Sequence, residues 1–424
     1  MLLEECVDKV SSPVLLEHLF RREAGRMVAW LAGQLGSQHL QLAEDAVQEA
    51  MLRAAQSWAF QGVPEKPEGW LFRVARNFAI SALRRSARMD GEALIATLEA
   101  CGADWESVEI EENLRDEELR MIFLCCHPEL SRESRVALSL KLVGGFGVGE
   151  IARVSLVEEA TIAQRLVRAK RVIREKRLPL AMPSRMVLRE RLDSVLEVIY
   201  LMFSGGYAAA SGEELIRQDV CMEALRLGRL VAASSMGAPR VHALVALMAL
   251  QAARLPARTD AAGDLVLLEE QDRALWDRKL IALGFSYFDR SIAGEEISEW
   301  HVQAAIASLY AAADEAIDWA GILENYDHLW TMTRSPVVAL NRAVAVMRVH
   351  GAAVALAELE QLEGSPALRG YHLLPAVRGR MLAELGRVDE AADAFQTALR
   401  CDCSEPERRF LWKQLEKAVR LRAS

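Results

Sequence analysis

The sequence is poor in cysteine and has no long apolar run, and both features exclude classes of protein. Seven cysteines in 424 residues is an odd number, at no spacing typical of a disulfide framework. The longest apolar run, residues 241–253, contains His242 and Gln251 and is shorter than the roughly 20 residues that a membrane span needs. Residues 1–5, MLLEE, lack the basic and apolar blocks of a signal peptide. We therefore expect a soluble cytoplasmic protein that has no membrane segment.

Aromatic residues are also scarce, at only 6% of the chain, and β-branched residues form no alternating runs. Apolar residues nevertheless account for 52% of the sequence, with alanine and leucine dominant, and they recur at helical spacing. The length is sufficient for two or three domains with buried cores. The composition therefore predicts an all-α fold.

Charge is distributed unevenly along the chain, whose formal net charge is −9. Residues 14–88 carry 10 basic and 7 acidic side chains, and residues 113–177 carry 13 basic and 9 acidic ones. Between them, residues 89–112 carry 8 acids and no base, while residues 178–424 have 27 bases against 33 acids. Two basic modules are thus joined by an acidic strip and followed by an acidic domain, so nucleic acid is not expected to bind over the whole surface.

Helix-ending residues indicate where these modules begin and end. Residues 61–67 contain two prolines and separate two helices of the first module, whereas Pro179 and Pro183 mark the start of the C-terminal part. In the second module, Ser131 is a good N-cap, and helices near 148–154 and 158–176 have helix-turn-helix spacing. We expect domains at residues 10–88, 113–178 and 184–424, with an acidic linker at 89–112.

The second helix of the predicted helix-turn-helix has one apolar and one basic face. Its apolar stripe contains Ile162, Leu166, Ala169 and Ile173, which is typical of a helix packed on one side. Basic helices of this kind fit the major groove of DNA, although most basic helix faces are simply solvated. The candidates for DNA contact are Thr161, Gln164, Arg165, Arg168, Lys170 and Arg171.

The first module combines aromatic and basic residues in another pattern. Aromatic rings near arginines can stack unpaired bases and hold a displaced strand, but some of these rings must form the module's core. The aromatic residues are Trp58, Phe60, Trp70, Phe72 and Phe78, among Arg73, Arg76, Asn77, Arg84, Arg85 and Arg88.

Several short motifs carry a family resemblance. Residues 43–50 (AEDAVQEA) and 67–77 (PEGWLFRVARN) resemble region two of bacterial sigma factors, and residues 150–152 with 161–170 (TIAQRLVRAK) resemble region four. The chain resembles the extracytoplasmic-function (ECF) group of the sigma-70 family, because no other sigma domain is evident. Residues 123–128 (FLCCHP) and 201–207 (LMFSGGY) resemble a subgroup with a C-terminal extension of tetratricopeptide-like repeats.

The resemblance implies a role for particular residues. The helix with Asp45, Gln48, Glu49 and Leu52 would dock on the clamp helices of core RNA polymerase, and the basic helix-turn-helix would lie near the polymerase flap and read the −35 promoter element. The acidic linker would thread near the RNA exit path. Recognition and opening of the −10 element would involve Trp70, Arg73, Arg76, Asn77, Phe78, Ser81, Arg84 and Arg85.

The sequence departs from the family pattern at three places. Ser81 stands where the family often has Asp, the helix-turn-helix turn holds Ser155 and Leu156 where Leu-Gly is usual, and Glu158 stands where Ser or Asp commonly caps the second helix. These departures concern promoter sequence preference more than the family resemblance.

Enzymatic and metal-binding functions have little support in the sequence. Cys125, Cys126 and His127 are consecutive on an apolar helix, whereas zinc ligands are usually two to four residues apart and number four. Cys401 and Cys403 have no second pair, and no phosphate-binding loop or catalytic triad is evident. We expect no catalytic activity, no metal and no cofactor.

The C-terminal part, residues 184–424, is predicted to consist of helical hairpins. Residues 379–398 match the tetratricopeptide pattern through Gly379, Leu382, Gly386, Ala391, Phe395 and Ala398. A helix break is expected near Pro256 and Gly263. This loop either binds a ligand or the sigma modules, or is simply held together by salt bridges. The residues around the break are Arg254, Arg258, Asp264, Asp272, Arg273 and Trp276. His301, Gln303 and Tyr310 could at most line a helical groove.

The leading hypothesis is a promoter-specificity subunit of RNA polymerase whose acidic C-terminal domain contacts the sigma regions and regulates them in cis. One alternative is a helix-turn-helix regulator that binds duplex DNA without polymerase and carries a helical sensor. The aromatic-rich first module argues against it, since a reader of duplex DNA has no need to capture unpaired bases. A third hypothesis is a tetratricopeptide scaffold, against which the two separate basic modules argue.

Overall fold

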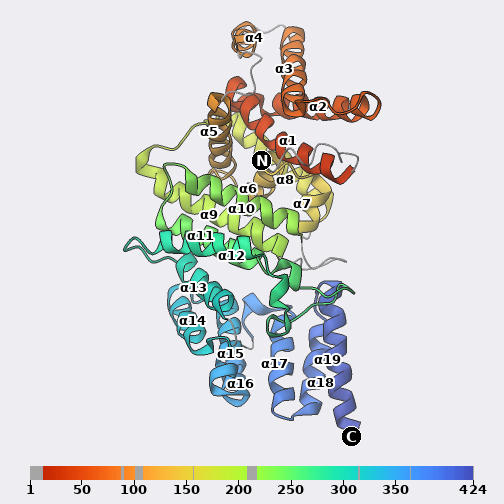
Figure 1. Cartoon of the computed structure of the whole chain (residues 1–424), viewed down its shortest axis with the longest axis vertical. Helices are drawn as coiled ribbons and strands as arrows, with labels where there is room; N and C mark the ends of the chain where they lie inside the picture. The colour runs from red at the N-terminus through yellow and green to blue at the C-terminus, as the bar shows by residue number, and fades with distance from the viewer. Residues whose placement is uncertain are drawn as a thin grey trace. The chain divides into compact units, whose positions relative to one another are not determined.

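The computed structural model describes residues 13–86, 90–100, 108–155, 157–207, 217–313, 316–362 and 364–423. These residues form helices joined by short connections, with one isolated β-bridge between Thr259 and Leu265 and no strand (Figure 1). The all-α fold predicted from composition is therefore confirmed. Contacts between Cα atoms divide the chain into two units, residues 1–202 and 203–424. No helix in the described ranges is both long and apolar enough to cross a membrane.

The first unit contains two groups of helices. The sequence places helix ends within a few residues of those observed: α3 ends at Ser86 and α6 begins after Ser131. Residues 10–12 and parts of the expected linker lie outside the described residues. Helix α4 occupies most of the first half of the linker. Helix α5 begins at Val108, before the expected start of the second module. The helices are α1 (Pro13–Leu35), α2 (Leu40–Gln61), α3 (Pro67–Ser86), α4 (Asp90–Ala100), α5 (Val108–Cys125), α6 (Arg132–Leu142), α7 (Val148–Ser155), α8 (Glu159–Glu175) and α9 (Arg185–Tyr207), with a short 3₁₀ turn at Ser37–His39.

Aromatic rings form much of the contact between α1, α2 and α3. Trp30 of α1 meets Phe72 of α3 edge-on at 6.0 Å between ring centroids, and Trp58 of α2 meets Trp70 of α3 at 5.5 Å. Phe72 and Trp58 are buried, and Trp70 is half-buried. These rings therefore have a structural role in the first module, as a core of this size requires.

Helix α1 also packs against the second group of helices, through α5 and α6. Two glycines of α1 lie very close to this second group. A Cβ added at Gly25 would lie 2.0 Å from the Val143 carbonyl oxygen, and one added at Gly33 would lie 2.2 Å from a carboxylate oxygen of Glu117. The hydroxyl of Ser37 donates to the carbonyl of Leu178 at 2.6 Å. Small residues on α1 thus allow the two groups of helices to form one unit.

We expect Gly25→Ala to destabilise the first unit by about 1–3 kcal/mol, because the new methyl group meets backbone atoms that cannot rotate away. The matched control is Gly149→Ala, where the nearest atoms belong to the flexible carboxylate of Glu159 and the gain in helix propensity is up to about 1 kcal/mol. Urea unfolding measures both variants. Wild-type stability in Gly25→Ala would contradict this close approach of α1 and α6.

The helices α6, α7 and α8 fold around an apolar centre. Ser131 caps α6 by accepting the backbone N–H of Ser134 at 3.3 Å, as the sequence predicts. The buried side chains include Leu138, Phe146 and Ile151 together with Ile162, Leu166, Ala169 and Ile173 from α8. The apolar stripe predicted for this helix is therefore its buried face.

The first part of α9 belongs to this unit. Arg191 donates to the Phe123 carbonyl at 2.5 Å, and Arg135 donates to Ser194 Oγ at 2.7 Å. Arg132 and Glu197 also form an ion pair, with 2.8 Å between Nε and Oε1. The boundary between the units accordingly lies within α9, at residues 202 and 203, C-terminal to the boundary near residue 184 that the prolines indicate.

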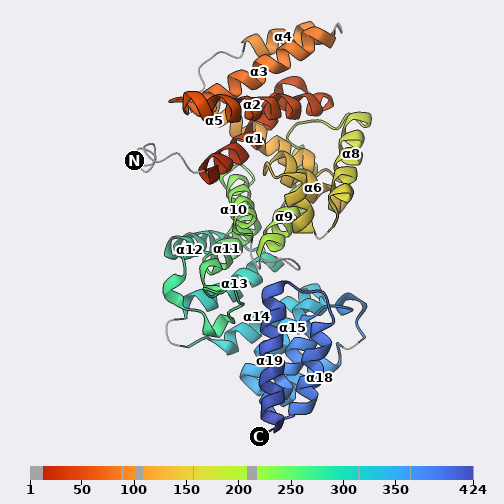
Figure 2. The same ribbon diagram turned by 90° about the vertical axis from the view of Figure 1, so that its right-hand side faces the viewer.

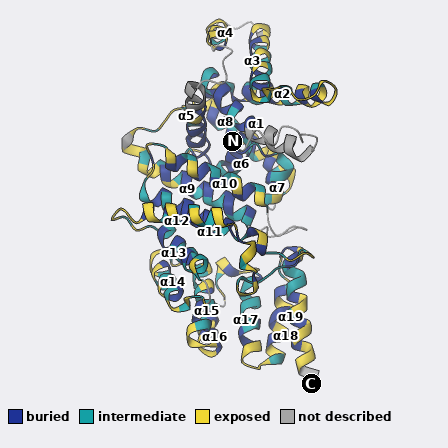
Figure 3. Cartoon of the chain, in the orientation of Figure 1, coloured by how far each residue is buried: buried dark blue, intermediate teal, exposed yellow. Residues whose placement is uncertain are grey.

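The second unit consists of helices that pack mainly against their neighbours in the sequence (Figure 2). The apolar run at residues 241–253 forms most of the buried helix α11, which is dark blue in Figure 3, as its length predicts. The helices are α10 (Gln218–Ala233), α11 (Pro239–Ala252), α12 (Arg278–Ser291), α13 (Glu299–Ala312), α14 (Trp319–Thr333), α15 (Pro336–His350), α16 (Ala352–Glu360), α17 (Leu373–Glu384), α18 (Val388–Leu399) and α19 (Glu405–Ala423). Short 3₁₀ turns lie at Leu255–Ala257, Leu268–Glu270, Arg273–Leu275 and Pro366–Leu368.

Helices α17 and α18 form a hairpin at the predicted repeat. A Cβ at Gly379 would lie 2.8 Å from the ring of Phe395, so only glycine allows this close approach. Gly386 ends α17 with φ of 72°, in the left-handed region that favours glycine. Leu382, Phe395 and Ala398 are buried in one core with residues of α15, α16 and α19.

His301 links the start of α13 to the end of α12. Its Nδ1 accepts the backbone N–H of Ser298 at 3.0 Å, which leaves Nε2–H to donate to the Ser291 carbonyl at 3.3 Å. Burial lowers the pKa of His301 below its ordinary value near 6.5. The side chain therefore caps α13 in its neutral form rather than lining a groove.

The low pKa of His301 makes the stability of the second unit dependent on pH. The unfolded chain binds a proton at about pH 6.5 and the folded chain binds it only below that, so this stabilisation is complete above pH 6.5 and is lost as the pH falls below it. We expect thermal unfolding to move to lower temperature between pH 7.5 and 5.5, and His301→Gln to reduce this pH dependence. The exposed His350→Gln variant is the control; equal pH dependence in both variants would contradict the prediction.

Candidate nucleic-acid interface

The outer face of α8 contains five of the six residues predicted to read DNA. At 100° per residue, Thr161, Gln164, Arg165, Arg168 and Arg171 lie on one side of the helix, opposite the buried stripe. Gln164, Arg168 and Arg171 are exposed, and Thr161 and Arg165 are half-buried. A helix that is buried on one side and basic on the other can enter a groove without losing its packing.

The turn before α8 has helix-turn-helix form. Helix α7 is short and buries Ile151 and Ala152, and the Glu150 carboxylate accepts the Gly147 backbone N–H at 2.7 Å. Glu158 occupies the N-cap of α8, but its side chain accepts no capping hydrogen bond. This departure from the family pattern leaves the N-terminal backbone amides of α8 without a side-chain cap. Leu156, named with the turn, lies outside the described residues.

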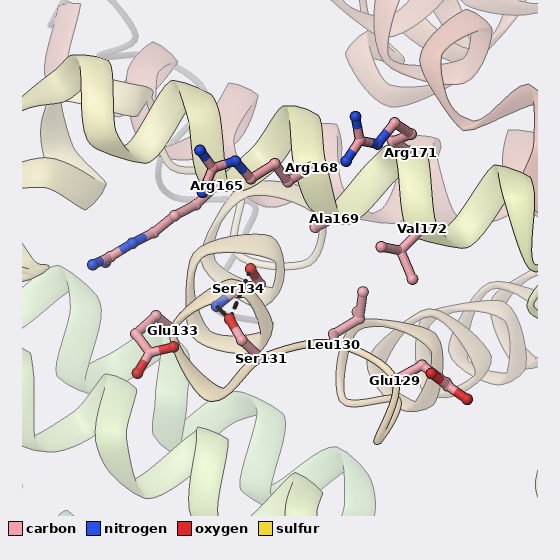
Figure 4. Close-up of a pocket in the computed structure, with 10 residues that line it drawn as sticks. All are labelled: Glu129, Leu130, Ser131, Glu133, Ser134, Arg165, Arg168, Ala169, Arg171 and Val172. Carbon is pink, nitrogen blue, oxygen red and sulfur yellow. Dashed lines mark hydrogen bonds between the residues drawn. The ribbon is translucent and has the colours of Figure 1, made fainter.

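A hollow of about 530 Å³ lies between α8 and the start of α6 (Figure 4). Arg165, Arg168 and Arg171 line the α8 side, whereas Glu129, Ser131, Glu133 and Ser134 line the other. A backbone amide and the Ser131 hydroxyl, with smaller effects of nearby arginines, hold the pKa of Glu133 below its ordinary value. Lys176 does the same for the pKa of Glu129. Both carboxylates are thus charged at neutral pH, and the basic face has an acidic border.

Lys170, the sixth predicted DNA contact, is placed differently. It lies on the flank of α8, forms an ion pair with Glu44 of α2 and donates to Gln41 Oε1 at 3.2 Å. Both side chains of the ion pair are mostly buried. Lys170 therefore does not lie with the other five residues. Its ion pair instead joins α8 to α2, the helix predicted to bind polymerase.

A polar stripe runs along α3. Arg73, Asn77, Ser81 and Arg84 recur at spacings of three or four residues and are all exposed. Ser81 Oγ donates to the Asn77 carbonyl at 2.8 Å, and Arg84 pairs with Glu99 of α4 at 2.6 Å. Arg85 is exposed beside this stripe, whereas Trp70, Arg76 and Phe78 are half-buried. The stripe is therefore the part of the predicted −10 set that is most accessible to a strand.

The outer face of α2 carries the residues predicted to bind polymerase. Asp45, Gln48 and Leu52 lie on one side at spacings of three and four, and 54% of Leu52 is exposed. Gln41 donates to Asp45 at 2.8 Å, and Arg53 pairs with the half-buried Glu49 at 2.7 Å. The four residues predicted to bind polymerase are therefore on a helix surface that a partner can reach, apart from the half-buried Glu49.

Phe60 is a candidate contact that the predicted −10 set omits. It lies in the last turn of α2, before the loop that leads to α3, and 91% of its surface is exposed. The sequence could have indicated this exposure through spacing. Phe60 comes two residues after the buried Trp58, and side chains two residues apart on a helix point to opposite sides. An exposed ring just before the loop that leads to α3 could stack an unpaired base.

The two consecutive cysteines do not form a reactive site. Cys125 and Cys126 are fully buried, and burial raises the pKa of Cys126 to about 12, so its thiol stays protonated. Within the described part of the chain, no group of three or more His, Cys, Asp or Glu side chains could hold a metal ion.

Comparisons with known proteins agree with this division of the chain. Residues 19–89 match the family profile of sigma-70 region 2, and residues 120–173 match that of sigma-70 region 4. The ECF RNA polymerase sigma-E factor of Escherichia coli is 30% identical over 142 residues, which cover 32% of this chain and 74% of the relative. This chain belongs to the ECF group of the sigma-70 family. The sigma-E factor of Salmonella typhimurium matches to the same extent.

Sigma-70 proteins are non-enzymatic transcription factors that bind core RNA polymerase and promoter DNA. In this sigma factor, the matched regions contain the α3 stripe and the outer face of α8. Residues 191–292 match a family of unknown function (DUF6596), and an uncharacterized protein of Rhizobium meliloti is 39% identical over 388 residues, covering 89% of this chain and 90% of the relative. No solved structure matches the chain.

Proposed function

We propose that this sigma factor directs core RNA polymerase to promoters through three helix faces. The outer face of α2 binds the polymerase clamp helices, the α3 stripe captures and opens the −10 element, and the outer face of α8 reads the −35 element near the polymerase flap. The single observation that carries the proposal is that each matched sigma region has most of its predicted nucleic-acid residues on an outer helix face, while the apolar stripe of the same helix is buried. These activities belong to the cytoplasm.

We also propose that the arrangement of the first unit is that of the polymerase-free protein. The −35 and −10 elements lie roughly 25 base pairs apart by their numbering, or about 85 Å at 3.4 Å per base pair. The contacts of Lys170 with Glu44 and of Ser37 with Leu178 hold α8 beside α2 in one compact unit. Regions two and four must separate to bind both elements, so these contacts break when the promoter complex forms.

The second unit is proposed to be a regulator in cis with tetratricopeptide-like hairpins. Its acidic net charge and covalent attachment support this role, and the α17–α18 hairpin has glycine and phenylalanine at the positions where tetratricopeptide helices approach closely. Such hairpins stack into surfaces that bind other segments of protein. The partner surfaces proposed here are regions two and four of the same chain.

Run-off transcription with purified core polymerase tests the sigma function. We expect defined start sites on genomic fragments, including the region upstream of the protein's own gene, only when this chain is added. Absence of starts together with a shift of duplex DNA by the chain alone would instead support a regulator that acts without polymerase.

Truncation tests the role of the second unit. The cut belongs after Met202 rather than near Pro183, because Arg191 and Ser194 of α9 bond to the first unit. We expect transcription by residues 1–202 to differ from that of the full chain. Equal transcription would contradict regulation in cis.

A further inference from the structure

The loop between α11 and α12 brings three arginines to aromatic rings within the second unit. The guanidinium carbons of Arg254 and Arg273 lie 5.4 Å and 4.7 Å from the centroid of the Trp276 ring, and that of Arg258 lies 3.9 Å from the centroid of Tyr207. Tyr310 of α13 borders the same group, since Arg273 donates to its carbonyl at 3.0 Å. We call these six residues the Arg–aromatic cluster.

None of these three arginines has a carboxylate partner among the described residues. Arg258 donates to the Tyr207 carbonyl, Arg273 to the Ala313 and Tyr310 carbonyls, and Arg254 only through Nε, to Gln271 Oε1 at 3.3 Å. The two terminal amino groups of Arg254 therefore donate to no described residue. The neighbouring indole N–H of Trp276 is also buried without an acceptor in the described structure, and only 4% of Trp276 is exposed.

Three acids of the same loop bind other groups of the second unit. Asp264 binds Arg409 and Lys413 of α19, and Glu269 binds Arg348 and Arg380. Asp272 caps the following turn by accepting the Ala274 backbone N–H at 2.9 Å. The alternative of a loop tied by salt bridges thus accounts for Asp264 and Glu269, but none of the described carboxylates pairs with the three arginines.

Positive charge in a half-buried place is costly unless an anion lies beside it, and no described side chain supplies that anion here. Burial is the largest cause that lowers the pKa of Arg254; Tyr207 and Tyr310 act in the opposite direction, and the charges of Arg258 and Arg273 add to the lowering. Burial also raises the pKa of Tyr310 to about 12, so that phenol stays neutral and supplies no negative charge. The cluster is therefore positive at neutral pH in a unit whose net charge is negative.

We infer that the Arg–aromatic cluster is a binding site for a small oxyanion, a phosphate or carboxylate group. The terminal amino groups of Arg254 and the indole N–H of Trp276 are donors that have no acceptor among the described residues. Guanidinium groups bind both kinds of oxyanion through paired hydrogen bonds. The bound anion would tie together the end of α9, the α11–α12 loop and the end of α13, because the arginines already donate to carbonyls there. The inference concerns the second unit alone and does not depend on the proposed sigma function.

Calorimetric titration of the full chain with inorganic phosphate, and separately with succinate, tests the site at constant ionic strength set with sodium chloride. We expect saturable binding of at least one anion and a matching rise in thermal unfolding temperature. Binding of phosphate alone identifies a phosphate-type ligand, binding of succinate alone a carboxylate, and binding of both a site that selects for oxyanion charge. Absence of saturable binding of either anion would overturn the inference.

Variants locate the binding within the molecule. Arg254→Gln removes the guanidinium donors and is expected to weaken binding by about tenfold or more. Arg254→Lys keeps the positive charge but loses the paired N–H donors of the guanidinium group, and should weaken binding less. Arg369→Gln removes the same charge from an exposed position of the second unit and should bind as the wild type does. Circular dichroism shows whether each variant is folded. Equal affinity of a folded Arg254→Gln and Arg369→Gln would overturn the assignment.

Discussion

Replacing Arg165 and Arg168 together by alanine is expected to abolish −35-dependent transcription, with a loss on the order of 100-fold or more. Both side chains project from the outer face of α8, and a good arginine–base contact discriminates by about 1–3 kcal/mol. The fold should survive, because the buried face of α8 is formed by other residues. Run-off transcription and binding of the polymerase complex to promoter DNA measure the loss.

The matched control removes two positive charges from the end of the same helix. Arg174 and Lys176 are exposed in the last turn and at the C-cap of α8, away from the first turns that reach base edges in helix-turn-helix proteins. Arg174→Ala/Lys176→Ala should weaken binding slightly and equally for all DNA sequences. If the two double variants lost activity to the same extent, the outer face of α8 would contribute charge alone, and base reading would have to be placed elsewhere.

The double variant Arg73→Ala/Asn77→Ala is expected to fail at opening the −10 element, while its binding to polymerase remains unchanged. Both residues are exposed on the α3 stripe, whereas the face proposed to bind polymerase belongs to another helix, α2. A hydrogen bond from a charged group contributes about 1.5–3 kcal/mol and one from a neutral amide about 0.5–1.5 kcal/mol, so loss of both lowers transcription from duplex promoters by roughly 100-fold.

A promoter that is already open over the −10 element is the control for that variant. On this template the polymerase no longer has to separate the strands, so the variant should recover most of its activity. Permanganate reactivity of unpaired thymines reports the opening directly. A variant that melted the duplex normally, or that failed equally on the open template, would show that the α3 stripe does not open DNA.

The sequence by itself determined the features of this protein that depend on neighbours within a helix. An apolar stripe every three or four residues predicts a helix and its buried face, which is why the all-α fold, the Ser131 cap and the buried side of α8 were predicted correctly. The net charge of each segment follows directly from its numbers of basic and acidic residues. The same local pattern separated the DNA-binding candidates of α8 from its core residues, because both sets lie on a single helix.

Only the tertiary structure decided which residues meet across the chain. Lys170 has the same local pattern as Arg168 or Arg171, and only the packing of α8 beside α2 shows that it pairs with Glu44. The position of the unit boundary within α9 likewise depends on Arg191 and Ser194 reaching α5 and α6. The loop after α11 contains acids and arginines close together in the sequence. In the fold, Asp264 and Glu269 pair with arginines of distant helices, whereas no described carboxylate pairs with Arg254. Such pairings join residues tens to more than a hundred positions apart, and periodicity within one helix carries no information about them.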